Sequence, residues 1–234
     1  LKYGHLTAPV TINLSTGLVD KGLNGTDTIV GFAGFNPNDG LGFAGTSGND
    51  TFIGSDLTSS WVQFIGDGGD DIYTGGLGTE RIDYRNAGSG VTVTFSSQGT
   101  GTTWSDGFGG VDTFTDIEEI RGSNFADTLT GSGGDERFIT RQGNDYVDGG
   151  AGFDTVRYDQ SGAGPVHVDL GAQMATGTWY GQAFTDTLIN IEAVRGSSGN
   201  DTLIGDNNSN ELNGKAGDDN INTGNNVGGI VGYD

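Results

Sequence analysis

The chain has 234 residues, a length that fits one large domain or a row of smaller units. Glycine contributes 46 residues and apolar side chains only 32%, so a conventional globular core is disfavoured. The formal net charge of −21 argues against nucleic acid as a partner, the absence of Cys excludes disulfides and thiolate metal sites, and no apolar run is long enough to span a membrane.

The acidic excess also predicts a requirement for cations. Asp and Glu number 31 against 10 Lys and Arg, and a charge of this size opposes compaction. With so few apolar residues, the bare chain is expected to be disordered or loosely folded. Multivalent cations would relieve the repulsion, and metal would replace the missing disulfides as a staple.

The first predicted element is a short strand in which every second residue is apolar. The same alternation occurs at residues 10–14, 91–95 and 166–170. It predicts strands with one buried face, each followed by a hairpin-like stretch rich in Gly, Ser and Thr. The three stretches lead to Asp27, Asp112 and Asp186, which we interpret as turn residues rather than metal ligands.

A nine-residue pattern follows these stretches. Glycines lead to an acidic residue at position six and an apolar residue at position eight, as in residues 149–157, GGAGFDTVR. The glycines permit turns with positive φ, and the last three residues form a short strand. Twelve copies form three blocks of four, at 45–83, 122–157 and 196–231, with three extra residues inside 54–65 around Trp61.

The apolar beat predicts how the strands assemble. Each short strand follows a turn, so the strands build two facing stacks, and two nonapeptides complete one coil with coils about 4.8 Å apart. The fold class is therefore predicted as all-β, a parallel β-roll of the β-solenoid type with three blocks joined by β-rich spacers. No helix is predicted, because frequent glycines destabilise one. The predicted inward residues are Phe52, Ile72, Ile82, Leu129, Phe138, Val147, Val156, Leu203, Leu212 and Ile221, preceded by Ile120 and Val194.

The acids at position six are candidate metal ligands. Because turns alternate between two edges, each loop is expected to stack on the loop two nonapeptides later, where peptide carbonyls complete an all-oxygen cage. Such a cage suits Ca²⁺ better than Mg²⁺. Zn²⁺ is disfavoured by the absence of Cys and by only two His, His5 and His167. Taken singly, each acid could instead cap its turn; the registered repetition favours calcium.

The stacking scheme pairs specific acids. On the first edge it pairs Asp50 with Asp71, Asp127 with Asp145, and Asp201 with Asp219. On the second edge Glu136 pairs with Asp154, Glu80 faces the loop with the extra residues, and Asn210 faces Gly228. Glu118 and Glu192 are candidate additional ligands where the second and third blocks begin. One complete calcium edge per block and a partly degenerate opposite edge are predicted.

These nonapeptides resemble the RTX family of bacterial secreted proteins, whose repeat has the form G-G-x-G-x-D-x-U-x. The resemblance covers about half of the residues. It implies several bound Ca²⁺ ions, export by a type I system, a chain that is unfolded in low-calcium cytosol, and folding outside the cell. The departures at 54–65, Asn210 and Gly228 leave full occupancy of the second edge open.

Tyrosines mark the joins between blocks. Tyr3, Tyr84, Tyr158 and Tyr233 follow one another at spacings of 81, 74 and 75 residues. The corresponding domain division is 1–83, 84–157 and 158–234, each part holding a spacer and its block. Because the repetition runs through both ends, we expect the chain to be a slice of a longer array.

Two functions fit these features. The favoured one is a calcium-binding structural or adhesive segment of a large secreted bacterial surface protein, such as a surface layer, adhesin or matrix fibre, in contact with neighbouring repeats or like subunits. The alternative is a calcium-dependent folding and export module of a type I-secreted lipase, protease or polysaccharide-modifying enzyme. Sequence beyond residues 1 and 234 would separate them.

No catalytic arrangement stands out, so the chain itself is not expected to be an enzyme. The two histidines do not lie at equivalent positions of the repeat, so neither is marked as a catalytic base. A pair of catalytic carboxylates cannot be singled out, because the acids already recur as structural positions of the repeats. Trp104 and Trp179 lie 13 residues after Val91 and Val166 and are predicted to be equivalent. We expect both to cover a coil edge or a block junction, with a sugar-stacking platform as the alternative.

Overall fold

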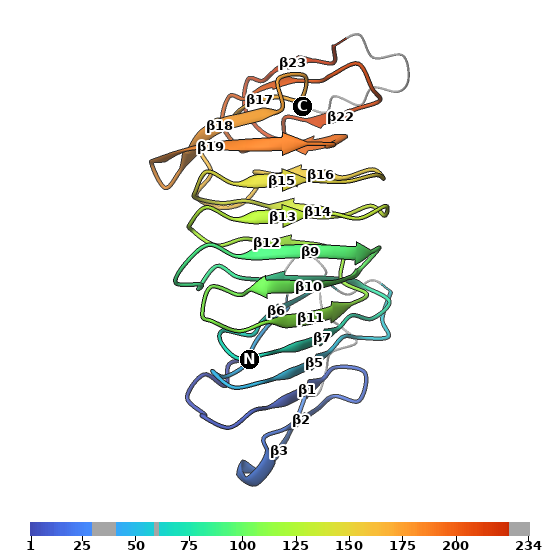
Figure 1. Cartoon of the computed structure of the whole chain (residues 1–234), viewed down its shortest axis with the longest axis vertical. Coiled ribbons are helices and arrows are strands. Elements are labelled where there is room, and N and C mark those ends of the chain that lie inside the picture. The colour runs from blue at the N-terminus through green and yellow to red at the C-terminus, as the bar shows by residue number, and fades with distance from the viewer. Residues whose placement is uncertain (30–40, 59–60, 225–234) are drawn as a thin grey trace. The chain divides into compact units, whose positions relative to one another are not determined.

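The structure is a computed structural model that describes residues 1–29, 41–58 and 61–224 (Figure 1). These residues divide between two compact units, Leu1–Arg121 and Gly122–Asp234. Within the described ranges every regular element is a strand except one 3-10 turn, Gly22–Asn24, and no helix is long and apolar enough to cross a membrane. The all-β prediction is confirmed, whereas the division into three sequence-repeat domains stays a prediction.

The first unit consists of two packed sheets. In one the strand order is β9-β10-β11-β7-β5-β1-β2-β3, and in the other β12-β8-β6-β4. The strands are β1 Thr11–Asn13, β2 Leu18–Asp20, β3 Thr26–Thr28, β4 Leu41–Ala44, β5 Thr51–Ile53, β6 Trp61–Ile65, β7 Ile72–Thr74, β8 Thr79–Asp83, β9 Thr92–Ser97, β10 Thr100–Ser105, β11 Asp112–Thr115 and β12 Glu119–Arg121.

The second unit repeats this plan. Its sheets have the orders β23-β21-β17-β18-β19-β15-β13 and β22-β20-β16-β14. The strands are β13 Thr128–Thr130, β14 Arg137–Ile139, β15 Tyr146–Asp148, β16 Thr155–Arg157, β17 His167–Asp169, β18 Met174–Trp179, β19 Gln182–Ile189, β20 Ala193–Arg195, β21 Thr202–Ile204, β22 Glu211–Asn213 and β23 Asn220–Asn222.

The nonapeptide strands alternate between the two sheets of each unit and pair in parallel with the strand one coil later. Leu129 lies opposite Val147, and Phe138 lies opposite Val156. Each pair is two nonapeptides apart, which confirms the predicted coil and the parallel β-roll. In the first block Phe52 lies opposite Tyr73, a longer separation because the extra residues precede β6.

The spacers form antiparallel meanders inside one sheet. In the second unit β17, β18 and β19 follow one another in antiparallel pairs, with β19 parallel to β15 and β17 parallel to β21 (Figure 1). The opposite sheet takes only one strand at this level, because β20 pairs directly with β16 and β22. The meander therefore adds two strands to one side of the roll while the acidic loops keep their stacking.

The inward positions form the core, with one correction to the sequence prediction. Phe52, Phe64 and Tyr73 pack together, with ring centroids 5.0–6.2 Å apart. Ile72, predicted to face inward, is 51% exposed, and Tyr73 is buried instead. Tyr73 occupies position eight of its nonapeptide, so strand alternation turns its side chain into the core and Ile72 outward.

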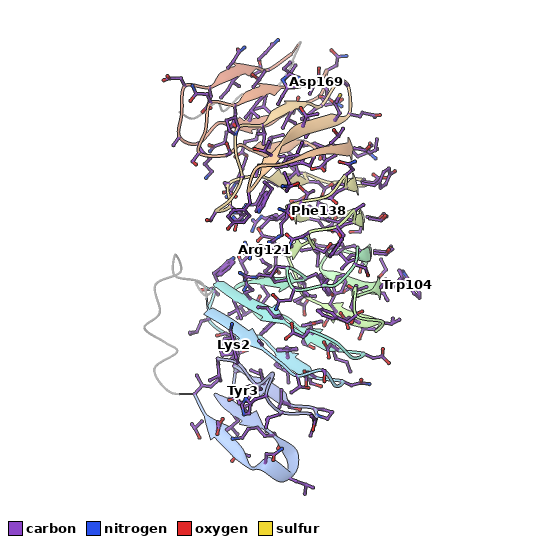
Figure 2. All side chains as sticks on the ribbon, turned by 90° about the vertical axis from the view of Figure 1, so that its left-hand side faces the viewer. Lys2, Tyr3, Trp104, Arg121, Phe138 and Asp169 are labelled. Atoms are coloured by element: carbon purple, nitrogen blue, oxygen red, sulfur yellow. The ribbon has the colours of Figure 1, made fainter. Side chains whose placement is uncertain are left out.

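The two spacer tryptophans are not equivalent. Trp104 is 62% exposed and Trp179 only 1% exposed, and Figure 2 shows the Trp104 side chain projecting away from its strand. A register shift between Thr103 and Ser105 leaves Trp104 unpaired in β10. In β18 the register is regular and Trp179 lies opposite Gln182 beside a tight turn. The predicted equivalence was therefore wrong, because equal distance along the chain ignored the different lengths of the hairpins.

Candidate calcium centre

In the first loop of each block, the acid at position six folds back over its own turn. Asp127 accepts the Ser123 N–H at 2.7 Å and the Ser123 hydroxyl at 2.6 Å. A Ser or Thr at position two thus serves the carboxylate four residues later with two donors. The same arrangement joins Asp50 to Thr46, Asp201 to Ser197, and, on the second edge, Glu136 to Ser132.

Each acid also reaches the neighbouring coil. The Asp127 N–H donates to Asp145 Oδ1 at 2.8 Å, and the Glu136 N–H donates to Asp154 Oδ1 at the same distance. Corresponding bonds run from Asp50 to Asp71 at 2.7 Å and from Asp201 to Asp219 at 2.8 Å. All four acid pairs that the stacking scheme requires are therefore in contact through a backbone donor and a carboxylate acceptor.

Glycine at position four is what lets the loops approach. Gly143 has φ +119° and Gly152 has φ +137°, conformations that disfavour side chains. A Cβ on Gly143 would overlap the carbonyl of Phe125, and one on Gly152 would overlap the carbonyl of Gly134. The carbonyls of one loop thus face the next loop at the edge where the acids lie.

The first-edge series continues into the spacers, which the sequence reasoning missed. The Asp71 N–H donates to Asp112 Oδ1 at 3.0 Å, and the Asp145 N–H donates to Asp186 Oδ1 at 3.1 Å. Asp112 lies in β11 and Asp186 in β19, so the turn interpretation was wrong for both. Asp27 likewise lies in a strand, β3.

A sequence signal for these spacer acids existed. The block-join tyrosine donates its hydroxyl to the spacer acid, Tyr84 to Asp112 and Tyr158 to Asp186, and both pairs are 28 residues apart. A tyrosine followed 28 residues later by an aspartate therefore recurs in the sequence in addition to the glycine pattern.

The second edge contains more connected carboxylates than predicted. The Glu80 N–H donates to Glu118 Oε2 at 2.8 Å, and the Asp154 N–H donates to Glu192 Oε2 at 2.9 Å. Both glutamates that precede the blocks therefore join the second-edge series. Asn210 accepts the Asp206 N–H through Oδ1, and its Nδ2 is buried without a hydrogen-bond partner. Gly228, its predicted neighbour, lies outside the described residues.

Several carboxylate oxygens in these series are buried without a hydrogen-bond partner. They are Oδ2 of Asp145, Asp154 and Asp219. Their loops share one feature: position two holds Arg141, Gly150 or Lys215 instead of Ser or Thr. Because a buried anionic oxygen without a donor is costly, these oxygens fit a cation as their missing partner.

Burial also shifts the acidity of these groups. Burial raises the pKa of Asp71 to about 8, that of Asp154 to about 8 and that of Glu80 to about 7. The pKa of Asp145 is raised by burial and by the nearby carboxylates of Asp186 and Asp127. Burial therefore makes the ionised form of these carboxyls costly in the folded loops, and a bound cation would offset that cost.

The donor chemistry points to a hard cation. Within the described ranges no three His, Asp or Glu side chains gather at one point, so one or two carboxylates must be joined by other donors. The loop carbonyls are the oxygens at hand. Calcium accepts such mixtures of carboxylate and peptide oxygens, whereas structural zinc needs Cys or His, and both histidines are exposed.

Fold and loops together define a calcium-binding β-roll built of repeated nonapeptides. Comparison with protein families agrees: the model for the RTX calcium-binding nonapeptide repeat, described as four copies, matches residues 113–145, 121–156 and 192–226. These segments are RTX repeats, a structural family that binds several Ca²⁺ ions and is typical of secreted bacterial proteins. The nonapeptides of 45–83 lie outside the match, although their loops stack in the same way. No curated protein matches the chain.

Proposed function

We propose that this chain is a structural or adhesive segment of a large secreted bacterial surface protein and folds when it meets calcium outside the cell. The observation that carries the proposal is the repeated set of buried carboxylate oxygens that lack a hydrogen-bond donor, in a chain of net charge −21. Such a chain has no preformed site when unfolded, so the free energy of metal binding becomes free energy of folding.

The ligands that we assign to calcium are the position-six acids of the stacked loops. They are Asp50, Asp71, Glu80, Asp127, Glu136, Asp145, Asp154, Asp201 and Asp219. In three of the four pairs, Asp127–Asp145, Glu136–Asp154 and Asp201–Asp219, the acid with a Ser at position two is held by that residue, and its N–H holds the next acid, whose second oxygen has no protein donor. In the fourth pair, Asp71 Oδ2 accepts the Tyr73 hydroxyl at 3.3 Å. When bound, calcium supplies the positive charge that these oxygens lack.

A structural role is supported by the regular elements of the described chain and by the contacts of its acids. Rolls and spacer strands account for its regular elements, and its position-six acids join neighbouring loops. Three spacer-and-block domains, 1–83, 84–157 and 158–234, are the repeating units of the proposal. Sequencing the coding region on either side tests the choice of parent: further blocks would support a surface or matrix protein, and an adjoining catalytic domain would favour an export module.

Calcium titration followed by circular dichroism tests the coupled folding. We expect disorder in chelator and β structure with calcium, with a midpoint in the range of extracellular modules, about 10⁻⁴–10⁻³ M. Magnesium at equal concentration is the control and should leave the chain largely unfolded, because it demands a stricter octahedral geometry. A chain that is fully folded in excess chelator would contradict the proposal.

A further inference from the structure

Three spacer acids occupy corresponding places in the chain. Asp27, Asp112 and Asp186 each follow a meander turn and accept a block-join tyrosine hydroxyl, from Tyr3, Tyr84 and Tyr158 at 2.8, 2.9 and 3.0 Å. In each case this bond uses one carboxylate oxygen, Oδ2. The other oxygen, Oδ1, distinguishes Asp27 from its two counterparts.

For the two internal acids, Oδ1 receives the preceding block. Asp186 accepts the Asp145 N–H at 3.1 Å, and the next residue, Thr187, returns its N–H to the Asp145 carbonyl at 2.8 Å. Around Asp112 the two distances to Asp71 are both 3.0 Å, with Thr113 as the returning donor. Two hydrogen bonds therefore dock the third loop of a block onto the spacer strand that follows.

At Asp27 a lysine, and not a loop N–H, is bonded to Oδ1. The Lys21 ammonium donates to Asp27 Oδ1 at 2.7 Å, and the Asp27 side chain is 43% exposed. In the described part of the chain, β3 is the last strand of its sheet. The residue that corresponds to Thr113 and Thr187 is Thr28.

The matching half of the dock lies in the third loop of the last block. Asp219 receives the Asp201 N–H at 2.8 Å, as Asp145 receives that of Asp127. It therefore corresponds to Asp71 and Asp145, and β23 directly follows it as the last described strand of its sheet. Its Oδ2 is among the buried oxygens without a donor.

We propose that strand β3 of one molecule, through Asp27, binds the Asp219 loop of a second copy. In that contact the Asp219 N–H displaces the Lys21 ammonium from Asp27 Oδ1. The Asp219 N–H donates to Asp27 Oδ1, and the Thr28 N–H donates to the Asp219 carbonyl, which reproduces the contact made twice within the chain. The contact is heterologous, head to tail, so it extends into a filament unless it closes into a ring. It rests on the proposed function, because the loops stack only in the calcium-folded chain.

Sedimentation velocity of the calcium-saturated chain over a concentration series tests the proposal. We expect concentration-dependent association in the wild type. Lys21→Met removes the competing donor and should tighten association by up to about fivefold, the scale of an exposed ion pair. Lys2→Met is the matched control, because Lys2 is an exposed lysine in the same unit and its loss changes the net charge equally.

Two further variants remove the dock itself. Asp27→Leu deletes the acceptor, and Thr28→Pro deletes the returning N–H while keeping the Tyr3–Asp27 bond, so that one of them informs even if the other folds poorly. Both should leave a calcium-folded monomer. The inference is overturned if the wild type and the Lys21→Met variant both stay monomeric. It is also overturned if neither Asp27→Leu nor Thr28→Pro weakens the association.

Circular dichroism of the same samples separates the two proposals. A folded, calcium-loaded monomer defeats only the docking inference, whereas failure to fold in calcium defeats the proposed function and the docking inference with it.

Discussion

The hydroxyl of Tyr84 donates a 2.9 Å hydrogen bond to Asp112 across 28 residues of sequence. Both side chains are buried, and burial raises the pKa of Asp112 to about 7. The other Asp112 oxygen receives the Asp71 N–H, so protein donors serve both oxygens. At this end of the first-edge series the second carboxylate oxygen is therefore held by a phenol hydroxyl, and Tyr158 with Asp186 repeats this arrangement.

This relationship predicts the effect of deleting the phenol oxygen. Tyr158→Phe leaves one Asp186 oxygen without its donor in a buried place, which should lower the free energy of unfolding in saturating calcium by about 1–3 kcal/mol. Denaturant unfolding measures the loss. Tyr180→Phe is the control, since Tyr180 is 67% exposed, and it should change little. Equal losses would show that the hydrogen bond contributes nothing.

Loop stacking predicts a strong effect of a single methyl group. Gly152→Ala places a Cβ at φ +137° against the Gly134 carbonyl. The backbone strain alone should cost about 1–3 kcal/mol, and the overlap adds to it. Gly133→Ala is the matched control in the same block, because a Cβ there meets nothing within 4 Å. Thermal unfolding in calcium should separate the two variants, and a tolerated Gly152→Ala would argue against close stacking.

The calcium assignment predicts unequal effects of two position-six substitutions. Asp145→Ala removes the acceptor of the Asp127 N–H together with a donor-free oxygen, so we expect fewer bound ions and a less stable second block. Asn210→Ala should change calcium stoichiometry less, because Asn210 supplies no carboxylate. Equilibrium dialysis with folding monitored in parallel measures both, and indistinguishable losses would reject the assignment of edges.

The raised pKa values predict how pH and calcium compete. Asp71, Asp154 and Glu80 have folded pKa values of about 8, 8 and 7, above their usual values of 3.8 and 4.5. A raised carboxyl pKa destabilises the metal-free fold as pH rises through this window, and the penalty disappears as pH falls toward the usual value. In chelator we therefore expect more β structure at pH 5 than at pH 8.

The same groups make calcium binding depend on pH in the opposite direction. Protons occupy the ligand oxygens in acid, so the calcium midpoint should move to higher concentration as pH falls from 8 to 5. Circular dichroism titrations at both values measure the shift. A calcium midpoint that does not depend on pH would mean that calcium does not displace protons from these carboxyls.

Much of the site was accessible from the sequence because the repeat has a fixed length. Two nonapeptides per coil place Asp127 against Asp145 without any knowledge of side-chain packing, and the structure brings them into contact. Counting residues failed where the chain departs from that length. Trp104 and Trp179 share a distance from their first strands but differ in hairpin geometry, so one is exposed and the other buried.

The sequence by itself determined the roll, the parallel pairing and the partners along each edge, because glycine, acid and apolar positions recur with one period and each coil packs only on its neighbours. The tertiary structure decided which carboxylate oxygens are buried and which of them the protein itself satisfies. A hydroxyl at position two is visible in the sequence, but the burial of the loop, and a donor such as the Tyr73 hydroxyl on Asp71, depend on the folded chain. The tertiary structure also decided that Asp112 and Asp186 continue the acidic series, since the meander brings them beside loops 41 residues earlier in the chain.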